Sequence, residues 1–228
     1  MVISHRWLTG LALLAGLSAC AVQDFRPQSL AKTDIDLVAD RSIQVLERQL
    51  RDLTTKLYRR NPRELGKGGQ TAKARLQQLF GNSGELRFAE LDHRQSVDAM
   101  LLAFDEEFAG DRVFALMAGL TDMLRRSYGY KAEYFVLDEL DEQKLYNSAR
   151  NIEILVWRLS QRRNARGELY LLTNEMSDDA TPDNLSFERL FGKMIAVQDL
   201  MAEITADGNQ RSINRVMQGA ASMIFLPI

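Results

Sequence analysis

A single cysteine, Cys20, carries the most distinctive chemistry in this sequence. The sulfur of a cysteine is a nucleophile in its thiolate form, and the 228-residue chain has no second cysteine with which Cys20 could pair. The residues before it are Leu17, Ser18 and Ala19, one apolar side chain and two small ones, at the end of an apolar stretch. Cys20 is therefore the one position that offers thiol chemistry, and the segment before it indicates which kind.

Residues 1–19 have the three parts of an export signal. A basic start with His5 and Arg6 precedes an apolar run from Trp7 to Leu17, and small residues stand at its end. The run is shorter than the stretch of about 20 apolar residues that a membrane-spanning helix requires. We therefore predict that 1–19 is a signal peptide that is removed.

The signal segment and Leu17-Ser18-Ala19-Cys20 together resemble the signal peptide and lipobox of bacterial lipoproteins. The resemblance implies that the Cys20 sulfur is alkylated with diacylglycerol, that the chain is cut before it, and that the new amino group is acylated. Two or three acyl chains would anchor the chain without a membrane-spanning helix. In Gram-negative members of this class an aspartate after the cysteine commonly marks inner-membrane retention, so Ala21 favours the periplasmic face of the outer membrane. The alternative is an ordinary secretory signal that happens to end in a cysteine.

The composition is that of a folded domain. Apolar residues make up 46% of the chain and charged residues 26%, as in soluble globular proteins. A formal net charge of −2 gives no reason to expect nucleic-acid binding. His93 is the only histidine after residue 19, which leaves few ligands for a transition metal. We expect no metal, and no cofactor other than the covalent lipid on Cys20.

Several short patterns could serve catalysis but match their motifs only in part. Glu90-x-x-His93 is one half of a ferritin-like metal pair, and Gly66-Lys67-Gly68-Gly69 lacks the spacing of a phosphate-binding loop, which favours a simple helix connector. Paired carboxylates of the kind that glycan-cleaving enzymes use occur at Asp105-Glu106-Glu107 and at Asp138, Glu139, Asp141 and Glu142. Both acidic runs lie at predicted helix ends, where such runs are usually solvated.

Two basic runs could contact anionic groups. Each ends or follows a predicted helix, where the helix dipole favours cations, so a structural role would explain both. The functional alternative is contact with lipid phosphates or acidic glycans, which makes the denser run the candidate contact patch. The denser run is Arg158, Arg162, Arg163 and Arg166, and the other is Arg59, Arg60, Arg63 and Lys67.

The spacing of apolar residues predicts an all-α, single-domain bundle over 33–228, after a short linker at 20–32. Apolar residues recur every three or four positions in seven stretches, which predicts about seven helices. These are 33–60, about 70–80, about 94–108, 113–128, 141–163, 185–206 and 209–225. Residues 130–137 and 168–173 are candidates for a short β pair, and 177–184 is predicted to be a polar loop.

From these features we predict a lipid-anchored, non-enzymatic interaction or scaffold component of an envelope assembly, with envelope proteins as partners. One alternative is a carrier that binds a lipid or other apolar ligand between helices, because methionines such as Met117, Met194 and Met201 lie on apolar faces and form adaptable surfaces. The second alternative is a murein-active enzyme. The apolar run 220–228 is expected to dock into the core, or to form a contact patch if it is exposed.

Overall fold

The computed structural model describes residues 32–176, 182–210, 212–215 and 224–228. Within them, seven α-helices and one 3-10 turn follow one another, with a two-stranded antiparallel sheet before the last helix. They are α2 (Asp34–Arg60), α3 (Pro62–Gly68), α4 (Ala72–Phe80), η2 (Ala89–Leu91), α5 (Ser96–Leu102), α6 (Arg112–Ser127), α7 (Glu142–Gln161), β1 (Glu175–Met176), β2 (Pro182–Asn184) and α8 (Ser186–Asn209). The predicted all-α bundle is confirmed.

The longest helix, α2, has both of its ends fixed by local sequence. The Thr33 hydroxyl accepts a hydrogen bond from the Asp36 N–H, and the Asp36 carboxylate accepts one from the Thr33 N–H at 2.7 Å, which is a capping box. The helix ends at Asn61, before Pro62. Pro62 is also the first residue of α3, a position that proline favours, so the chain resumes as a helix that includes residues 66–68 of the predicted connector.

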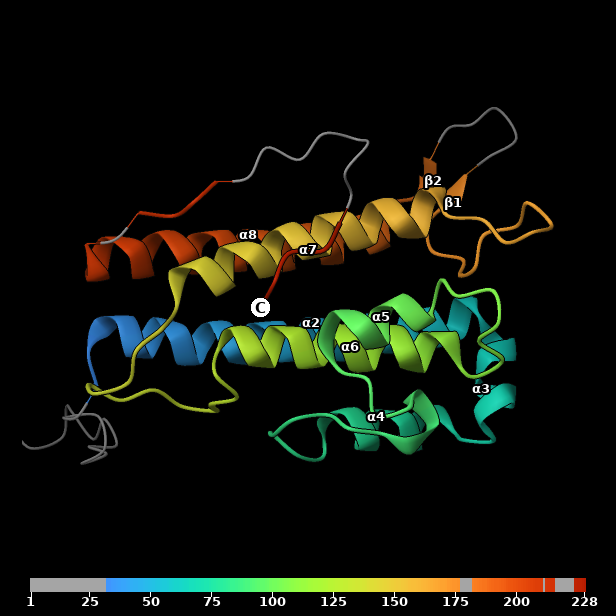
Figure 1. Cartoon of the computed structure of the whole chain (residues 1–228), viewed down its shortest axis with the longest axis horizontal. Coiled ribbons are helices and arrows are strands. Elements are labelled where there is room, and N and C mark those ends of the chain that lie inside the picture. Colours follow the sequence, from blue (N-terminus) through green and yellow to red (C-terminus); the bar gives the residue numbers. More distant parts are fainter. Residues whose placement is uncertain (1–31, 177–181, 211, 216–223) are drawn as a thin grey trace, which may run out of the picture. The chain divides into compact units, whose positions relative to one another are not determined.

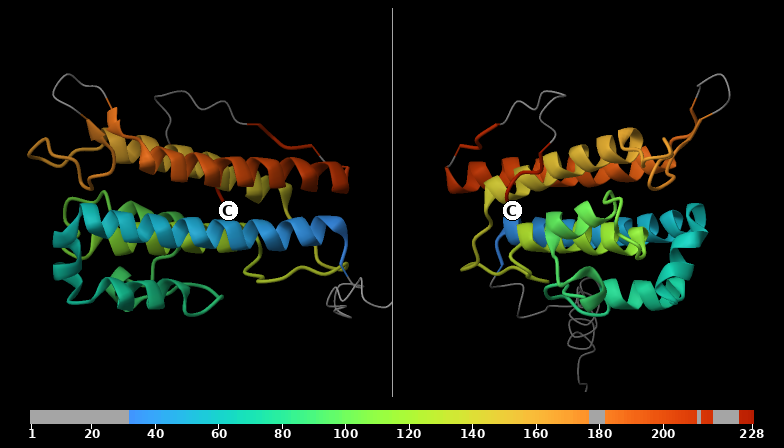
Figure 2. Two further views of the ribbon diagram at one scale, coloured as in Figure 1. Left: turned by 180° about the vertical axis from the view of Figure 1, so that it is seen from behind. Right: turned by 45° about the vertical axis from the view of Figure 1, so that its right-hand side comes forward.

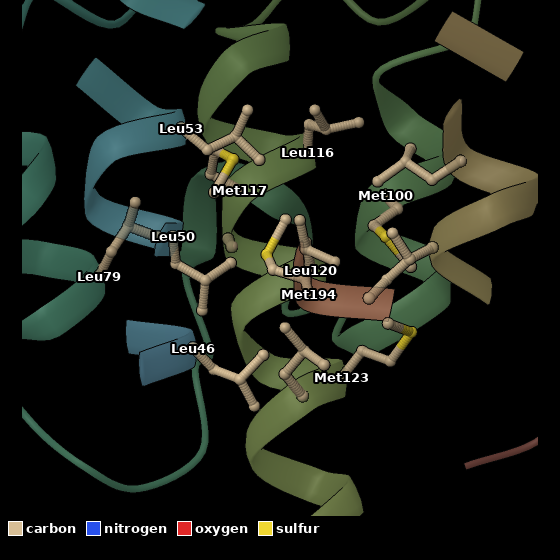
Figure 3. Packing of buried hydrophobic residues seen from close by; sticks show 14 of the residues in the cluster. Leu46, Leu50, Leu53, Leu79, Met100, Leu116, Met117, Leu120, Met123 and Met194 are labelled. Atoms are coloured by element: carbon tan, nitrogen blue, oxygen red, sulfur yellow. The ribbon is translucent and has the colours of Figure 1, made fainter. Parts of the chain in front are cut away.

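The helices pack in layers. Helices α7 and α8 lie side by side and cover a second layer of α2, α5 and α6, with α4 on the far side of that layer (Figures 1 and 2). Figure 3 shows the leucines of α2 facing α6 in the buried core, with Met194 of α8 reaching in from the upper layer. Gly119 lets the backbone of α6 pack closely against α5, because a Cβ there would lie 2.4 Å from the Ser96 carbonyl oxygen. The described part of the chain has no helix that is both long and apolar enough to cross a membrane.

The predicted β pair is wrong in its location. Residues 130–137 form a loop, because the Tyr134 N–H donates to the Asp40 carboxylate at 2.8 Å and its hydroxyl donates to the Tyr128 carbonyl, which ties the stretch to α2 and α6. The stretch 168–173 has only one isolated bridge, between Arg163 and Leu169. The strands lie instead at β1 and β2, and β2 falls inside the predicted polar loop, whose residues 177–181 are outside the described residues.

Two predicted helices have different bounds. The helix predicted over 94–108 is only Ser96–Leu102, because the Arg112 guanidinium donates to the carbonyl oxygens of Leu102, Ala103 and Asp105 and so terminates it. The helix predicted over 209–225 is also wrong where it can be compared. Helix α8 continues through Asn209, residues 212–215 and 224–228 are not helical, and 216–223 lie outside the described residues.

The expected docking of the last apolar run is confirmed for residues 224–228. Phe225 and Ile228 are half-buried against the hydrophobic core, although Ile224 remains 73% exposed. Residues 220–223 lie outside the described residues. The segment 224–228 therefore belongs to the folded unit Thr33–Ile228.

Candidate functional site

An open, positively charged cleft lies between α2 and α8. Lys56 and Arg59 of α2 face Arg189 and Lys193 of α8 across a cavity of about 410 Å³. We call these four side chains the basic cleft. The other lining residues are Asp52, Thr55, Ser186 and Leu190.

Helical spacing places these cations. Residues three or four apart lie on one face of a helix, so Lys56 and Arg59 share a face of α2, and Arg189 and Lys193 share a face of α8. The two faces meet because α2 packs against α8, with the buried ring of Phe187 between them. The Lys56 Nζ lies 5.0 Å from the centre of that ring, a favourable cation–π distance.

The positive charge of the basic cleft is not neutralised by the residues around it. Within the described parts of the chain, none of its four cations forms an ion pair, and Asp52 is the single carboxylate among the lining residues. Burial lowers the pKa of Lys56, the nearby Arg189 lowers it further, and Asp52 opposes the shift. The first turn of α8 has no side-chain cap, so its N-terminal dipole adds positive potential at the same place. An anionic ligand would relieve this repulsion.

The predicted contact patch lies nearby but is largely engaged with its own chain. The Arg158 guanidinium lies 5.0 Å from the Phe225 ring centre, and burial, together with Arg162, lowers its pKa. Arg163 donates to the Gly167 carbonyl oxygen at 3.0 Å. Arg166 forms an exposed ion pair with Glu168 at 3.5 Å. The patch stays a prediction, and it offers fewer uncommitted cations than the basic cleft does.

Both basic runs nevertheless lie at the same end of the bundle (Figures 1 and 2). The Asn61 side chain, at the end of α2, donates to the Leu172 carbonyl oxygen at 2.9 Å and accepts from the Leu172 N–H at 2.8 Å. This pair of bonds fixes the loop after α7 beside the end of α2. The sequence could not show that two runs about 100 residues apart converge, because the contact depends on tertiary packing.

Three of the acidic groups considered for glycan cleavage make contacts within the fold. Glu106 accepts from the Tyr170 hydroxyl at 2.7 Å and from the Ala165 N–H. Asp138 pairs with Lys131, and Asp141 is the N-cap of α7. These three carboxylates therefore close a loop or cap a helix, and the glycan-cleaving alternative stays a prediction.

Glu90 and His93, proposed as half of a metal motif, separate in the structure. His93 is exposed in a turn with a φ of +57°. Glu90 accepts two hydrogen bonds, at 2.6 and 2.8 Å, from the fully buried guanidinium of Arg75. No group of three or more His, Cys, Asp or Glu side chains converges among the described residues.

The buried Arg75 also explains one glycine of the former phosphate-loop candidate, Gly68. A Cβ on Gly68 would lie 2.0 Å from Nη2 of Arg75, so glycine at that position makes room for the guanidinium. The connector predicted at 66–69 is shorter than expected, because residues 66–68 belong to α3.

Comparison with known proteins gives no match to a family model, a curated protein or a solved structure. The lipobox residues Leu17, Ser18, Ala19 and Cys20 lie outside the described residues, so the anchor stays a prediction. Function must therefore be inferred from the chemistry of the sites themselves.

Proposed function

We propose that this chain is a lipid-anchored interaction component of a Gram-negative envelope assembly, attached through Cys20 to the periplasmic face of the outer membrane. Its basic cleft receives acidic side chains of a partner protein. The observation that carries the proposal is the convergence of Lys56, Arg59, Arg189 and Lys193 on one open cleft without an ion-pair partner among the described residues.

The basic cleft lies near the end of α2 that is remote from Thr33. A rise of 1.5 Å per residue places Lys56 about 35 Å along α2 from Thr33, where the linker joins the helix. The linker at 20–32 can extend at most about 40 Å. The tether therefore enters at one end of α2 while the basic cleft lies near the other. The start of α2 therefore need not contact a partner protein that binds in the basic cleft.

The carrier alternative has weaker support in the described structure. An apolar pocket between α2 and α6 is lined by Leu46, Leu50 and Leu124, but its cavity measures about 50 Å³. Pockets that bind small ligands usually measure about 300–1,000 Å³, so this pocket is too small for an acyl chain in the described structure. A lipid would need the helices to separate.

Proximity labelling in cells tests the proposal. The labelling enzyme is fused to the full chain, and the charge-reversal variant Arg189→Glu/Lys193→Glu is compared with wild type. Lys73→Glu/Arg94→Glu is the matched control, because it reverses two exposed cations that do not line the basic cleft.

We expect a discrete set of envelope proteins to be labelled by wild type and by the control, and to be lost with the cleft variant. If the labelled set is the same for all three chains, the basic cleft does not recruit the partner.

A further inference from the structure

The loop between α6 and α7 carries three consecutive apolar side chains that face solvent. They are Phe135, Val136 and Leu137, and we call them the apolar tip. All three are exposed, Val136 to 58% and Leu137 to 91%, which is the largest exposed fraction of any large apolar side chain in the described residues. Single apolar residues are common on protein surfaces, but a contiguous exposed group marks a site of interaction with a protein or a membrane.

Contacts on either side of the apolar tip hold it out of the helical core. Tyr134, the residue before it, is buried, and its hydroxyl donates to the Tyr128 carbonyl oxygen. Phe135 and Asp138 close a turn, because the Phe135 N–H donates to the Asp138 carboxylate at 3.0 Å and the Asp138 N–H donates to the Phe135 carbonyl oxygen at 2.7 Å. Lys131 pairs with the same carboxylate. The structure around the apolar tip therefore fixes its exposure.

The loop that carries the apolar tip lies beside the start of α2 (Figures 1 and 2). The Tyr134 N–H donates to the Asp40 carboxylate at 2.8 Å, and Asp40 lies only about 10 Å along the helix from Thr33. Leu37, three residues before Asp40, shares a face of α2 with it and is exposed as well. Exposed apolar side chains from two elements therefore gather at the end of the bundle where the predicted linker joins α2.

We propose that the apolar tip inserts into the phospholipid leaflet that holds the lipid anchor on Cys20. The proposal rests on the anchor in the proposed function, but not on the basic cleft. The linker at 20–32 reaches at most about 40 Å, so the leaflet is the one surface that the anchor keeps permanently close to the start of α2. Three side chains alone would bind a membrane weakly, but the tether raises their effective concentration at its surface. Insertion of the apolar tip then sets which end of the domain faces the membrane.

The charges around the apolar tip favour insertion by apolar contact over attraction to anionic lipid. Lys131 is the only cation in residues 130–141, and it pairs with Asp138. Glu133 and Glu139 are exposed acidic residues on either side of the tip. Polybasic segments bind anionic lipid through charge, and such binding weakens with salt. We therefore expect the apolar tip to enter a zwitterionic leaflet, and its insertion to persist at high salt.

A fluorescent probe on the apolar tip tests the insertion in the full, lipidated chain. With the Cys20 sulfur alkylated, Leu137→Cys supplies the single free thiol for an environment-sensitive nitrobenzoxadiazole dye. Leu172→Cys is the matched control, because Leu172 is also an exposed leucine of a loop but is held beside Asn61, at the other end of α2. Each labelled chain is added to phosphatidylcholine vesicles that contain lipid with a nitroxide quencher near the top of its acyl chains. Flotation of the vesicles separates the bound chain.

We expect the nitroxide lipid to reduce the fluorescence at position 137 at least about twofold, because apolar groups at the membrane interface lie about 5–10 Å into the leaflet. The fluorescence at position 172 should not change, and the quenching at 137 should persist at high salt. Adding Phe135→Ser/Val136→Ser should abolish the quenching at 137. Flotation and the circular dichroism spectrum should stay as in wild type, because both replaced side chains are exposed and the acyl chains alone suffice to hold the protein.

Several results would overturn the inference. Equal quenching at positions 137 and 172, or none at either, in chains that float with the vesicles would mean that the anchor holds but the apolar tip does not insert. Emission at 137 that shifts to the blue without quenching would mean that protein, such as a second copy of the chain, covers the tip. Loss of quenching at high salt would mean that charge drives the contact. A chain that does not float would refute the anchor of the proposed function, and this inference with it.

Discussion

Replacing the buried Arg75 should destabilise the fold more than the loss of an ordinary surface charge. The variant Arg75→Met keeps the length of the side chain and removes the guanidinium. In the wild-type chain that group bonds twice to Glu90, lies 3.2 Å from the Asp111 carboxylate and lies 3.9 Å from the Phe114 ring centre.

The expected cost follows from what remains buried after the change. Glu90 is 39% exposed and can turn to water, but the Asp111 side chain is 1% exposed and cannot. Removing one partner of a buried charge pair costs about 3–5 kcal/mol, and we expect the free energy of unfolding to fall by that amount. The change is a large fraction of a typical total of about 5–15 kcal/mol.

Asp111→Asn is the matched partner variant. Asparagine can still accept the N-cap hydrogen bond from the Phe114 N–H, so a smaller loss of about 1–2 kcal/mol is expected. Because Arg75 and Asp111 interact, the double variant should lose about 1–3 kcal/mol less than the sum of the two single variants.

Urea unfolding followed by circular dichroism at 222 nm measures all three variants. Burial raises the pKa of Asp111, while Arg75 is among the groups that lower it. A carboxyl whose folded-state pKa lies above its unfolded value contributes stability at low pH and loses that contribution as the pH rises through the folded pKa. The deficit of Arg75→Met should therefore shrink toward pH 4. A loss under 1 kcal/mol, or strict additivity with Asp111→Asn, would refute this reasoning.

Three further predictions concern single side chains. Burial raises the pKa of the fully buried Asp122, so the contribution of Asp122 to stability is largest at low pH and declines as the pH rises. The stability of Asp122→Asn relative to wild type, measured by urea unfolding at pH 4 and pH 8, should therefore increase with pH. Burial and Arg189 lower the pKa of Lys56, so Lys56→Met should unfold at the same temperature as wild type or a higher one in differential scanning calorimetry. Proximity labelling of the partner should fall. A marked loss of stability would show that Lys56 is structural. Cys20→Ser should leave an uncut, unlipidated precursor, and an unchanged mature mass with unchanged membrane fractionation would disprove the anchor.

The bounds predicted for α2, 33–60, agree with the structure because local sequence fixes both ends of the helix. The capping box at Thr33 and the break at Pro62 depend on residues within a few positions of one another, and such interactions can be read from spacing alone. The early end of α5 could not be predicted in this way, because the group that terminates it, the Arg112 guanidinium, lies in another helix.

The candidate sites were harder to predict from the sequence for the same reason. Composition alone predicted a contact patch at the arginine run 158–166, yet most of its arginines contact other residues of the same chain. The basic cleft depends on two pairs of cations from α2 and α8 that become neighbours only when those helices pack. The cations of each pair are three or four residues apart on a predicted helix, so their shared face was predictable, but their meeting was not. The exposed apolar tip was not predicted either, because residues 130–137 were expected to pair as a strand.

Site-specific photocrosslinking in cells tests the central claim most directly. A photoreactive amino acid is placed at Lys193, which lines the basic cleft, and in a parallel chain at Lys73, an exposed residue of α4 on the far side of the layer formed by α2, α5 and α6. The account predicts an adduct from position 193 alone, with the crosslinked peptide of the partner rich in Asp and Glu. No adduct at 193, or equal adducts at both positions, would contradict it.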